Sequence, residues 1–329
     1  MHQAVSHGAR RARYRGLPRT RLDHIYMACA LNLLRLHAYW TGTPLDRQRT
    51  SHLARLELSL AALPELTTRI ITADKSGGMS PVAGFRREDC LYLDVYRPSG
   101  AAPGARLPVL VWFHGGGWTQ GTGVIYGGPT MARLTSTIVI SINYPLGALG
   151  WLALPQLDRE QPVTLSGNYG MLDQIQALKW VRENASRFGG DPRDVTIDGQ
   201  SAGADAVCTM LASPLARGLF TRAIIQSLGC AQSALSPQAQ EKTSRQFAAD
   251  AGCADAATMV SCLRSAWAPN LIAAQQKVNA AQPAYGTPVL PALPSAALAS
   301  GRWNKVPVLI GGVRREGKLV RHRPVGPDR

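Results

Sequence analysis

The stretch Asp198-Gly199-Gln200-Ser201-Ala202-Gly203 has the form Gly-x-Ser-x-Gly and is the most informative part of this chain. A run of β-forming residues, 195–197, leads into it, and a helix-compatible run, 204–211, leads out. A sharp turn between a strand and a helix strains its central serine and projects the hydroxyl outward. The pattern therefore predicts a strand, a turn and a helix, with Ser201 as a candidate nucleophile.

Two glycines flank this serine, and each has a physical reason to be there. In so tight a turn, a side chain at Gly199 or Gly203 would collide with the neighbouring strand or helix. The Gly-x-Ser-x-Gly string is weak evidence alone, because its residue types are common. The strand-like and helix-like flanks are what strengthen it.

Strand-like and helix-like segments alternate along the chain. Residues 168–187 place apolar side chains on one helical face, and the run 189–192, with two glycines and a proline, ends that helix. The run 109–113 is continuously apolar, as in a strand covered on both faces. Alternation of this kind predicts an α/β protein with a mostly parallel, doubly wound sheet. The expected strands are 88–96, 109–113, 138–142, 195–197, 222–226 and 306–310.

A histidine and three glycines, His114-Gly115-Gly116-Gly117, follow the apolar run 109–113. Ligands of open α/β sheets gather at the carboxyl ends of the strands. Uncovered amides in this loop, together with the amide of Ala202, could form an oxyanion hole. The alternative is a flexible loop with no donor role, but the Ser201 turn favours the oxyanion interpretation. We expect His114 to be a structural part of the loop rather than a base.

Composition is that of a globular protein, and its charge is concentrated at the two ends. The 329 residues carry a net charge of +15, and 45% of them are hydrophobic. Residues 1–60 hold ten Lys/Arg against three Asp/Glu, and residues 314–329 hold six against two. The long segment between them is close to neutral for its length. A nucleic-acid partner is therefore not indicated for most of the chain.

The basic N-terminal region differs from the rest. Helical runs at 25–40 and 53–63 follow an Arg-rich segment. A targeting segment is one interpretation, but Arg35 and His37 interrupt the apolar run and no cleavage pattern follows. A nucleic-acid surface is another. Residues 8–58 resemble the C-terminal tail of a bacterial insertion-sequence transposase of the DDE type. The resemblance is carried by the strings 11–17, 20–24, 30–36 and 40–42, and it implies a fused or read-through reading frame rather than an activity.

A second resemblance covers residues 84–318, which are similar to the type-B carboxylesterase family that includes the cholinesterases. That family has an α/β-hydrolase fold and cleaves carboxylic esters through an acyl-enzyme. The resemblance therefore implies an incomplete α/β-hydrolase domain at 71–329, behind a helical extension at 1–70. Six strings in the family's order carry it: 88–93, 114–118, 167–174, 188–192, 199–204 and 306–311.

The resemblance also implies roles for individual residues. Ser201 matches the nucleophile, and Gly116, Gly117 and Ala202 match the residues that supply the oxyanion-hole amides. Glu316 matches the acid of the catalytic triad, because Arg315-Glu316-Gly317 stands where the family has Asp-Glu-Gly. Gln200 replaces the more frequent glutamate, which removes a charge beside the nucleophile but leaves the turn intact.

The base of the triad is not identified. In this fold the chain order is serine, acid, histidine, and the family's histidine follows about a hundred residues after the acid. The candidate beyond Glu316 is His322, whose two flanking arginines disfavour the imidazolium that the mechanism creates. Residues 1–70 do not resemble the family's first strands. We therefore expect a carboxylesterase truncated at both ends.

The cysteines suggest limited cross-linking. Cys253 and Cys262 match the family's short disulfide loop, although reduced thiols are the default without a convincing export signal. Cys90 is expected to be a free thiol, because its partner would lie in the missing segment. Cys29, Cys208 and Cys230 are expected to be packing residues. No spacing of Cys and His indicates a metal site.

These patterns lead to two competing hypotheses. The first is hydrolysis of a small-molecule carboxylic ester, without a cofactor or metal, by a cytoplasmic protein that does not enter a membrane, although family members are often secreted. The second is an inactive esterase fragment, or a DNA-associated product of the basic N-terminus. The specific ester and the oligomeric state are not indicated.

Overall fold

The computed structural model describes residues 67–69, 91–99, 101–102, 104–160, 166–231, 234–278 and 280–312. The expected N-terminal helices and the transposase-like stretch 8–58 lie outside these ranges. So do Cys29, Cys90, Glu316 and His322. The division of the chain at residue 70 stays a prediction.

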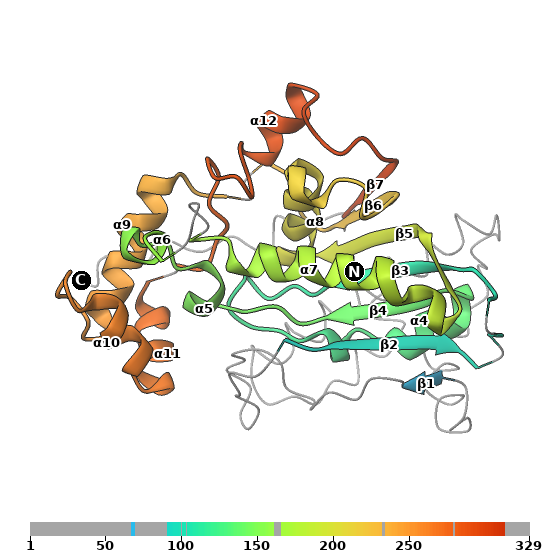
Figure 1. Ribbon diagram of the computed structural model, residues 1–329, viewed down its shortest axis with the longest axis horizontal. Helices are drawn as coiled ribbons and strands as arrows, with labels where there is room; N and C mark the ends of the chain where they lie inside the picture. The colour runs from blue at the N-terminus through green and yellow to red at the C-terminus, as the bar shows by residue number, and fades with distance from the viewer. Residues whose placement is uncertain are drawn as a thin grey trace, which may run out of the picture.

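The described strands form one mixed sheet in the order β1-β2-β4-β3-β5-β6-β7 (Figure 1). β2 pairs antiparallel with β1 and β4, and every other neighbouring pair is parallel. The prediction of a mostly parallel α/β sheet is therefore confirmed. The strands are β1 Thr67–Arg69, β2 Leu93–Pro98, β3 Leu107–Phe113, β4 Ile138–Ile142, β5 Gly190–Gln200, β6 Arg222–Gln226 and β7 Val308–Gly311.

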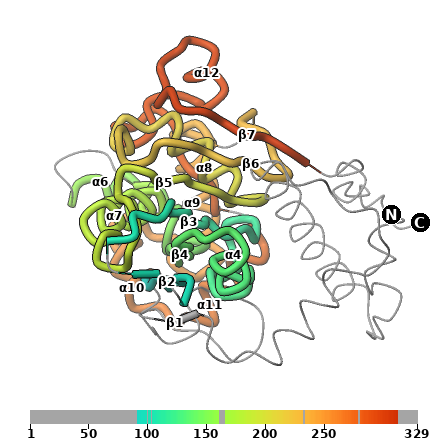
Figure 2. Tube along the Cα trace, turned by 90° about the vertical axis from the view of Figure 1, so that its right-hand side faces the viewer, coloured from blue at the N-terminus to red at the C-terminus, as the bar shows by residue number. Residues whose placement is uncertain are grey.

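Helices cover both faces of this sheet (Figure 2). α7 (Tyr169–Asn184) and α8 (Ala202–Ala212) pack on one face, over the large core cluster that includes Val109 and Val111. α4 (Gly128–Thr135) packs on the other face, over Leu110 and Trp112. Alternate residues of β3 thus belong to opposite cores. This explains why its sequence is a continuous apolar run.

The shorter helices connect these layers or lie beyond them. The 3₁₀ turns are η2 Gly123–Ile125, η3 Ala185–Phe188 and η4 Pro214–Ala216, and the remaining helices are α5 Ala148–Trp151, α6 Pro155–Asp158, α9 Pro237–Asp250, α10 Met259–Ser265, α11 Ala268–Lys277 and α12 Pro294–Ala299. No helix of the described ranges is both long and apolar enough to cross a membrane.

Helices α9, α10 and α11, residues 237–277, form what we call the outer helical unit. They gather beyond the carboxyl ends of the parallel strands (Figure 1). The unit shares a small core with α5 and the start of α6, in which Phe247, Met259 and Leu271 are buried beside Ala148 and Leu154. Its helices therefore stand above the sheet edge at which α/β proteins bind ligands.

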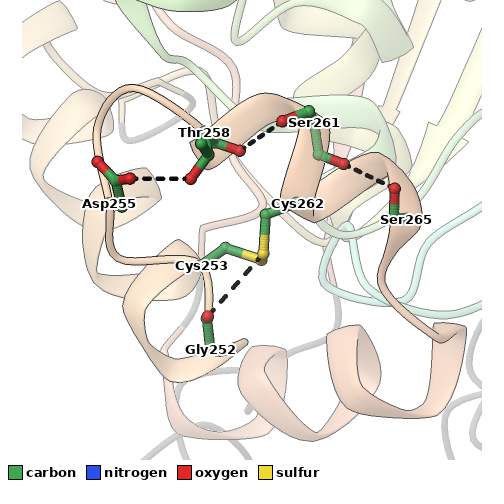
Figure 3. Close-up of a disulfide and its surroundings, with 7 residues drawn as sticks. All are labelled: Gly252, Cys253, Asp255, Thr258, Ser261, Cys262 and Ser265. Atoms are coloured by element: carbon green, nitrogen blue, oxygen red, sulfur yellow. Dashed lines mark hydrogen bonds between the residues drawn. A yellow bond between two sulfur atoms is a disulfide. The ribbon is translucent and has the colours of Figure 1, made fainter.

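A disulfide joins Cys253 to Cys262 and ties the end of α9 to α10 (Figure 3). Its two Cα atoms are 5.6 Å apart, within the range that a disulfide requires. The family's short disulfide loop is therefore present. Reduced thiols, the default from the sequence, are not what this structure contains.

A second disulfide joins Cys208 of α8 to Cys230 in the loop after β6. The prediction that both cysteines are packing residues was wrong. α8 runs beside that loop, which brings the Cα atoms within 5.3 Å of each other across a separation of 22 residues. No local sequence pattern predicts that α8 and this loop lie close together in the folded chain.

Candidate active site

Ser201 occupies the turn between β5 and α8, as the sequence predicts. Its φ of 57° and ψ of −124° are a backbone conformation that L-residues rarely adopt. Its amide donates a hydrogen bond to the carbonyl oxygen of Gln226, 3.0 Å away on β6. The neighbouring strand and the first turn of α8 hold the serine in this strained geometry, which is typical of functional sites.

The flanking glycines are glycines for the predicted reason. A Cβ on Gly199 would overlap the backbone of Gly203 in α8, and a Cβ on Gly203 would overlap the carbonyl oxygen of Phe113 at the end of β3. At both positions the atoms that would be overlapped belong to the backbone, so the clash cannot be relieved by rotating a side chain. The turn is therefore as tight as the Gly-x-Ser-x-Gly pattern indicates.

The glycine loop after β3 lies directly against the serine turn. A Cβ on Gly115 would lie 2.6 Å from the carbonyl oxygen of Gln200 and 3.2 Å from the Cβ of Ser201. Gly116 and Gly117 have φ values of 124° and 63°, which other residues rarely adopt. Two segments about 85 residues apart in sequence thus meet at the carboxyl edge of the sheet.

Three backbone amides of the serine turn and the adjoining glycine loop have no acceptor among the described residues. They belong to Gly116, Gly117 and Ala202, the residues that the sequence assigns to an oxyanion hole. Buried or partly buried amides normally have partners, so open amides at one place mark a possible binding position for an anion or a carbonyl oxygen.

His114 is fully buried, and its observed contacts are structural. Its Nδ1–H donates to the carbonyl oxygen of Gly115 over 2.8 Å, and its ring stacks on Tyr144 with centroids 4.4 Å apart. Burial lowers the pKa of His114 to about 4, so the ring is neutral at pH 7. This environment agrees with the expectation of a structural histidine. It is the single histidine of the described ranges.

Sequence reasoning missed a buried carboxyl group three residues before the serine. The side chain of Asp198 is fully buried, and both of its oxygens accept from Nε2 of Gln226, at 2.9 and 3.1 Å. Burial raises the pKa of Asp198 to about 7, against a smaller lowering by Gln226. An aspartate inside the run of β-forming residues that forms β5 was the available signal.

The side chain of Gln200 is also buried, immediately before the nucleophile. Its Oε1 would lie 3.2 Å from a Cβ on Gly115. The residue thus fills the space between the serine turn and the glycine loop without adding a charge. The structure brings the Ser201 turn against the glycine loop, whereas Glu316 and His322 lie outside the described residues.

The model of the carboxylesterase family matches residues 65–326, most of the chain. The chain belongs to the carboxylesterase family. Among curated relatives, the fumonisin B1 esterase of Sphingopyxis macrogoltabida is 38% identical over 72% of this chain and 44% of its own length. The para-nitrobenzyl esterase of Bacillus subtilis is 39% identical over 70% of this chain and 48% of its own length. The chain spans about half the length of these carboxylesterases.

Solved carboxylesterases have the same fold. A para-nitrobenzyl esterase matches with a TM-score of 0.67 and 36% identity, over 78% of this chain and 55% of that one. A carboxylesterase of Geobacillus stearothermophilus matches with a TM-score of 0.66 and 35% identity, over 74% and 51%. The sheet and helices described above are therefore those of an α/β-hydrolase.

Proposed function

We propose that this chain hydrolyses small-molecule carboxylic esters through an acyl-enzyme on Ser201. The observation that supports it most is the juxtaposition at the sheet edge: a strained serine at the start of α8 lies against the glycine loop at Gly115, and the amides of Gly116, Gly117 and Ala202 have no acceptor among the described residues. Membership of the carboxylesterase family makes an ester the expected substrate.

In the first half-reaction, Oγ of Ser201 attacks the carbonyl carbon of the ester, and its proton passes to a base. The carbonyl π electrons move onto the oxygen, and the amides of Gly116, Gly117 and Ala202 donate to that oxyanion. The carbon–oxygen bond to the alcohol then breaks, and the alcohol takes the proton from the base. Water attacks the remaining acyl group in the second half-reaction, releasing the acid and restoring the serine.

Glu316 is the proposed acid, which would orient the base and stabilise its positive form. His114 does not suit the role of base, because its Nδ1–H is committed to Gly115 and its pKa is lowered to about 4 by burial. The base is therefore not assigned. An inactive esterase-like chain is the alternative, since serine attack without a base is slow.

A p-nitrophenyl acetate assay on the full chain separates these possibilities. Ser201→Ala should lower the rate of p-nitrophenol release by about 10³-fold or to the buffer rate. Ser186→Ala, at an exposed serine of η3, is the matched control and should leave the rate unchanged. Turnover that Ser201→Ala does not reduce would exclude the proposal. A single stoichiometric burst without turnover would support Ser201 as nucleophile in a chain that lacks an effective base.

A further inference from the structure

An oxyanion hole needs the amides of Gly116 and Gly117 to point at the substrate oxygen. In the glycine loop, the carbonyl of each of these peptide groups accepts a hydrogen bond, and this fixes the direction of the amide. In a trans peptide, the C=O and N–H bonds point in opposite directions. A partner on the carbonyl therefore fixes where the amide of the next residue points.

The two peptides that carry the open amides are each anchored through their carbonyls. The Gly115 carbonyl accepts from Nδ1–H of His114 at 2.8 Å, which directs the Gly116 amide to the opposite side. The Gly116 carbonyl accepts from the amides of Thr119 and Gln120 at 3.2 and 3.1 Å, which directs the Gly117 amide likewise. Both amides are left without an acceptor in the described part of the chain.

The peptide before them, between His114 and Gly115, is held at both ends by tyrosine hydroxyls. The hydroxyl of Tyr144 donates to the His114 carbonyl over 2.6 Å. The hydroxyl of Tyr126 accepts from the Gly115 amide over 3.2 Å. Rotation of this peptide would break both bonds, and it would also swing the following peptide, whose amide belongs to Gly116.

Both tyrosines are fixed by packing that is separate from the nucleophile. Tyr144 lies two residues after the end of β4, is fully buried, and contacts the rings of His114 and Trp118. Tyr126 ends η2, and its ring centroid is 5.0 Å from that of Trp112. Burial, with smaller contributions from Tyr126 and Asp205, raises the pKa of Tyr144 well above its ordinary value. Its hydroxyl therefore keeps the proton that it donates.

We infer that Tyr126 and Tyr144 are positioning residues of the oxyanion loop, gripping the His114–Gly115 peptide so that the Gly116 and Gly117 amides face the substrate oxygen. The catalytic consequence rests on the proposed function. The grip, meaning the two hydrogen bonds between the tyrosine hydroxyls and the His114–Gly115 peptide, is a property of the loop alone. Neither hydroxyl needs to touch the substrate. Their contribution is to the geometry of donors that act only when negative charge develops.

Tyr126→Phe and Tyr144→Phe remove the hydroxyls and keep the rings. Because misplaced donors weaken binding of the transition state more than binding of the ester, each change should lower kcat for p-nitrophenyl acetate by about 10-fold or more and leave KM within about 2-fold. Affinity for a trifluoromethyl ketone, which forms an oxyanion adduct with the serine, should fall by a similar factor. The double variant should be little worse than the more impaired single variant, because one peptide carries both bonds.

Tyr169→Phe is the control, since it removes a tyrosine hydroxyl from the first turn of α7, outside the loop. It should leave kcat and ketone affinity unchanged. A purely structural role for Tyr126 and Tyr144 would lower the melting temperature without a selective loss of kcat, and that result would overturn the inference. Unchanged kcat in an active enzyme would do so as well, while Ser201 remained supported.

Amide hydrogen exchange gives a second readout that does not depend on turnover. Exchange of the peptide that contains residues 114–117 should be faster in Tyr144→Phe and Tyr126→Phe than in the parent and in Tyr169→Phe. If the parent chain proves inactive, the proposed function fails while faster exchange still supports the grip. Exchange that is equal in all four proteins would overturn the grip whatever the activity.

Discussion

The serine turn and the outer helical unit are built on different principles. In the turn, Gly199 and Gly203 allow the backbones of β5, α8 and β3 to touch, and a single added Cβ overlaps main-chain atoms. In the outer helical unit, Gly252 lies in the bend after α9, a Cβ added to it would meet no atom within 4 Å, and a disulfide ties the bend to α10. Steric exclusion determines the backbone conformation of the serine turn, whereas a disulfide and a small core stabilise the outer helical unit.

This difference teaches where the chain tolerates change. The turn cannot relax without moving a strand or a helix of the main core, so its sequence is constrained residue by residue. The outer helical unit can lose a bond or gain a methyl group and keep the sheet beneath it intact. Substitutions in the two regions should therefore differ in their cost.

Gly203→Ala should destabilise the protein by about 4 kcal/mol or prevent folding, because its Cβ would overlap the Phe113 carbonyl. Gly252→Ala is the matched change in the outer helical unit. Gly252 has a φ of 84° but no atoms near an added Cβ, so the cost should be the backbone strain alone, about 1 kcal/mol. Urea unfolding of both variants measures the two values. Equal costs would contradict the contrast.

Replacing Cys253 and Cys262 by serine should lower the free energy of unfolding by about 2.5 kcal/mol, as expected for a loop of this length. The loss of stability should be confined to the outer helical unit, so faster amide exchange is expected in residues 237–277 and not in β3 or β5. The matched removal of the bond between Cys208 and Cys230 should instead loosen α8. Exchange that rises throughout the sheet in the first variant would argue against independent stabilisation.

Asp198→Asn should change how stability depends on pH. Burial raises the folded-state pKa of Asp198 to about 7, so its contribution to stability is full below its unfolded pKa near 4 and is lost as pH rises to 7. The slope over this window is about −1.4 kcal/mol per pH unit at most, and it should disappear in the variant. The amide still accepts from Gln226 through Oδ1.

Two other groups of the described residues titrate in the same window, and their contributions cancel in the difference between parent and variant. The lowered pKa of His114 makes stability rise with pH between about 4 and 6.5, and the pKa of Asp173, raised to about 6 by burial, acts in the opposite direction. Chemical unfolding at several pH values gives the two curves. Parallel curves for parent and Asp198→Asn would show that this carboxyl group does not cause the fall in stability between about pH 4 and 7.

Ser201→Gly should raise the free energy of unfolding by about 1 kcal/mol, because glycine adopts a φ of 57° without strain. Ser201→Ala keeps the Cβ and should not give this gain. Both variants should lack esterase activity, so stability and activity separate at one residue. Thermal and urea unfolding compare the three proteins. A loss of stability in Ser201→Gly would mean that the serine geometry is not strained.

Much of the fold and part of the site could be predicted from the sequence. Continuous apolar runs indicated β3 and β4, and the helical face of 168–187 indicated α7, because burial imposes these patterns locally. The serine turn could be predicted because its tight backbone requires glycine at fixed positions before and after the serine. α4 was missed, because its sequence is short and begins with Gly-Pro and so has little helical periodicity.

Features that depend on tertiary approach could not be predicted in this way. The bond between Cys208 and Cys230 requires α8 to lie beside a loop that follows another strand. The tyrosines that hold the glycine loop lie 11 and 30 residues beyond the groups they bind, in segments with no repeating pattern. Burial of Asp198 against Gln226 likewise joins two adjacent strands that are 28 residues apart in sequence.

Covalent labelling of Ser201 measures whether this serine is a nucleophile. The full chain would be incubated with diethyl p-nitrophenyl phosphate, whose phosphorus is attacked by the serine oxygen with release of p-nitrophenolate. Peptide mass spectrometry should then find one diethylphosphoryl group, on Ser201, and none in the Ser201→Ala variant. Labelling at other residues, or equal labelling of both proteins, would contradict the account.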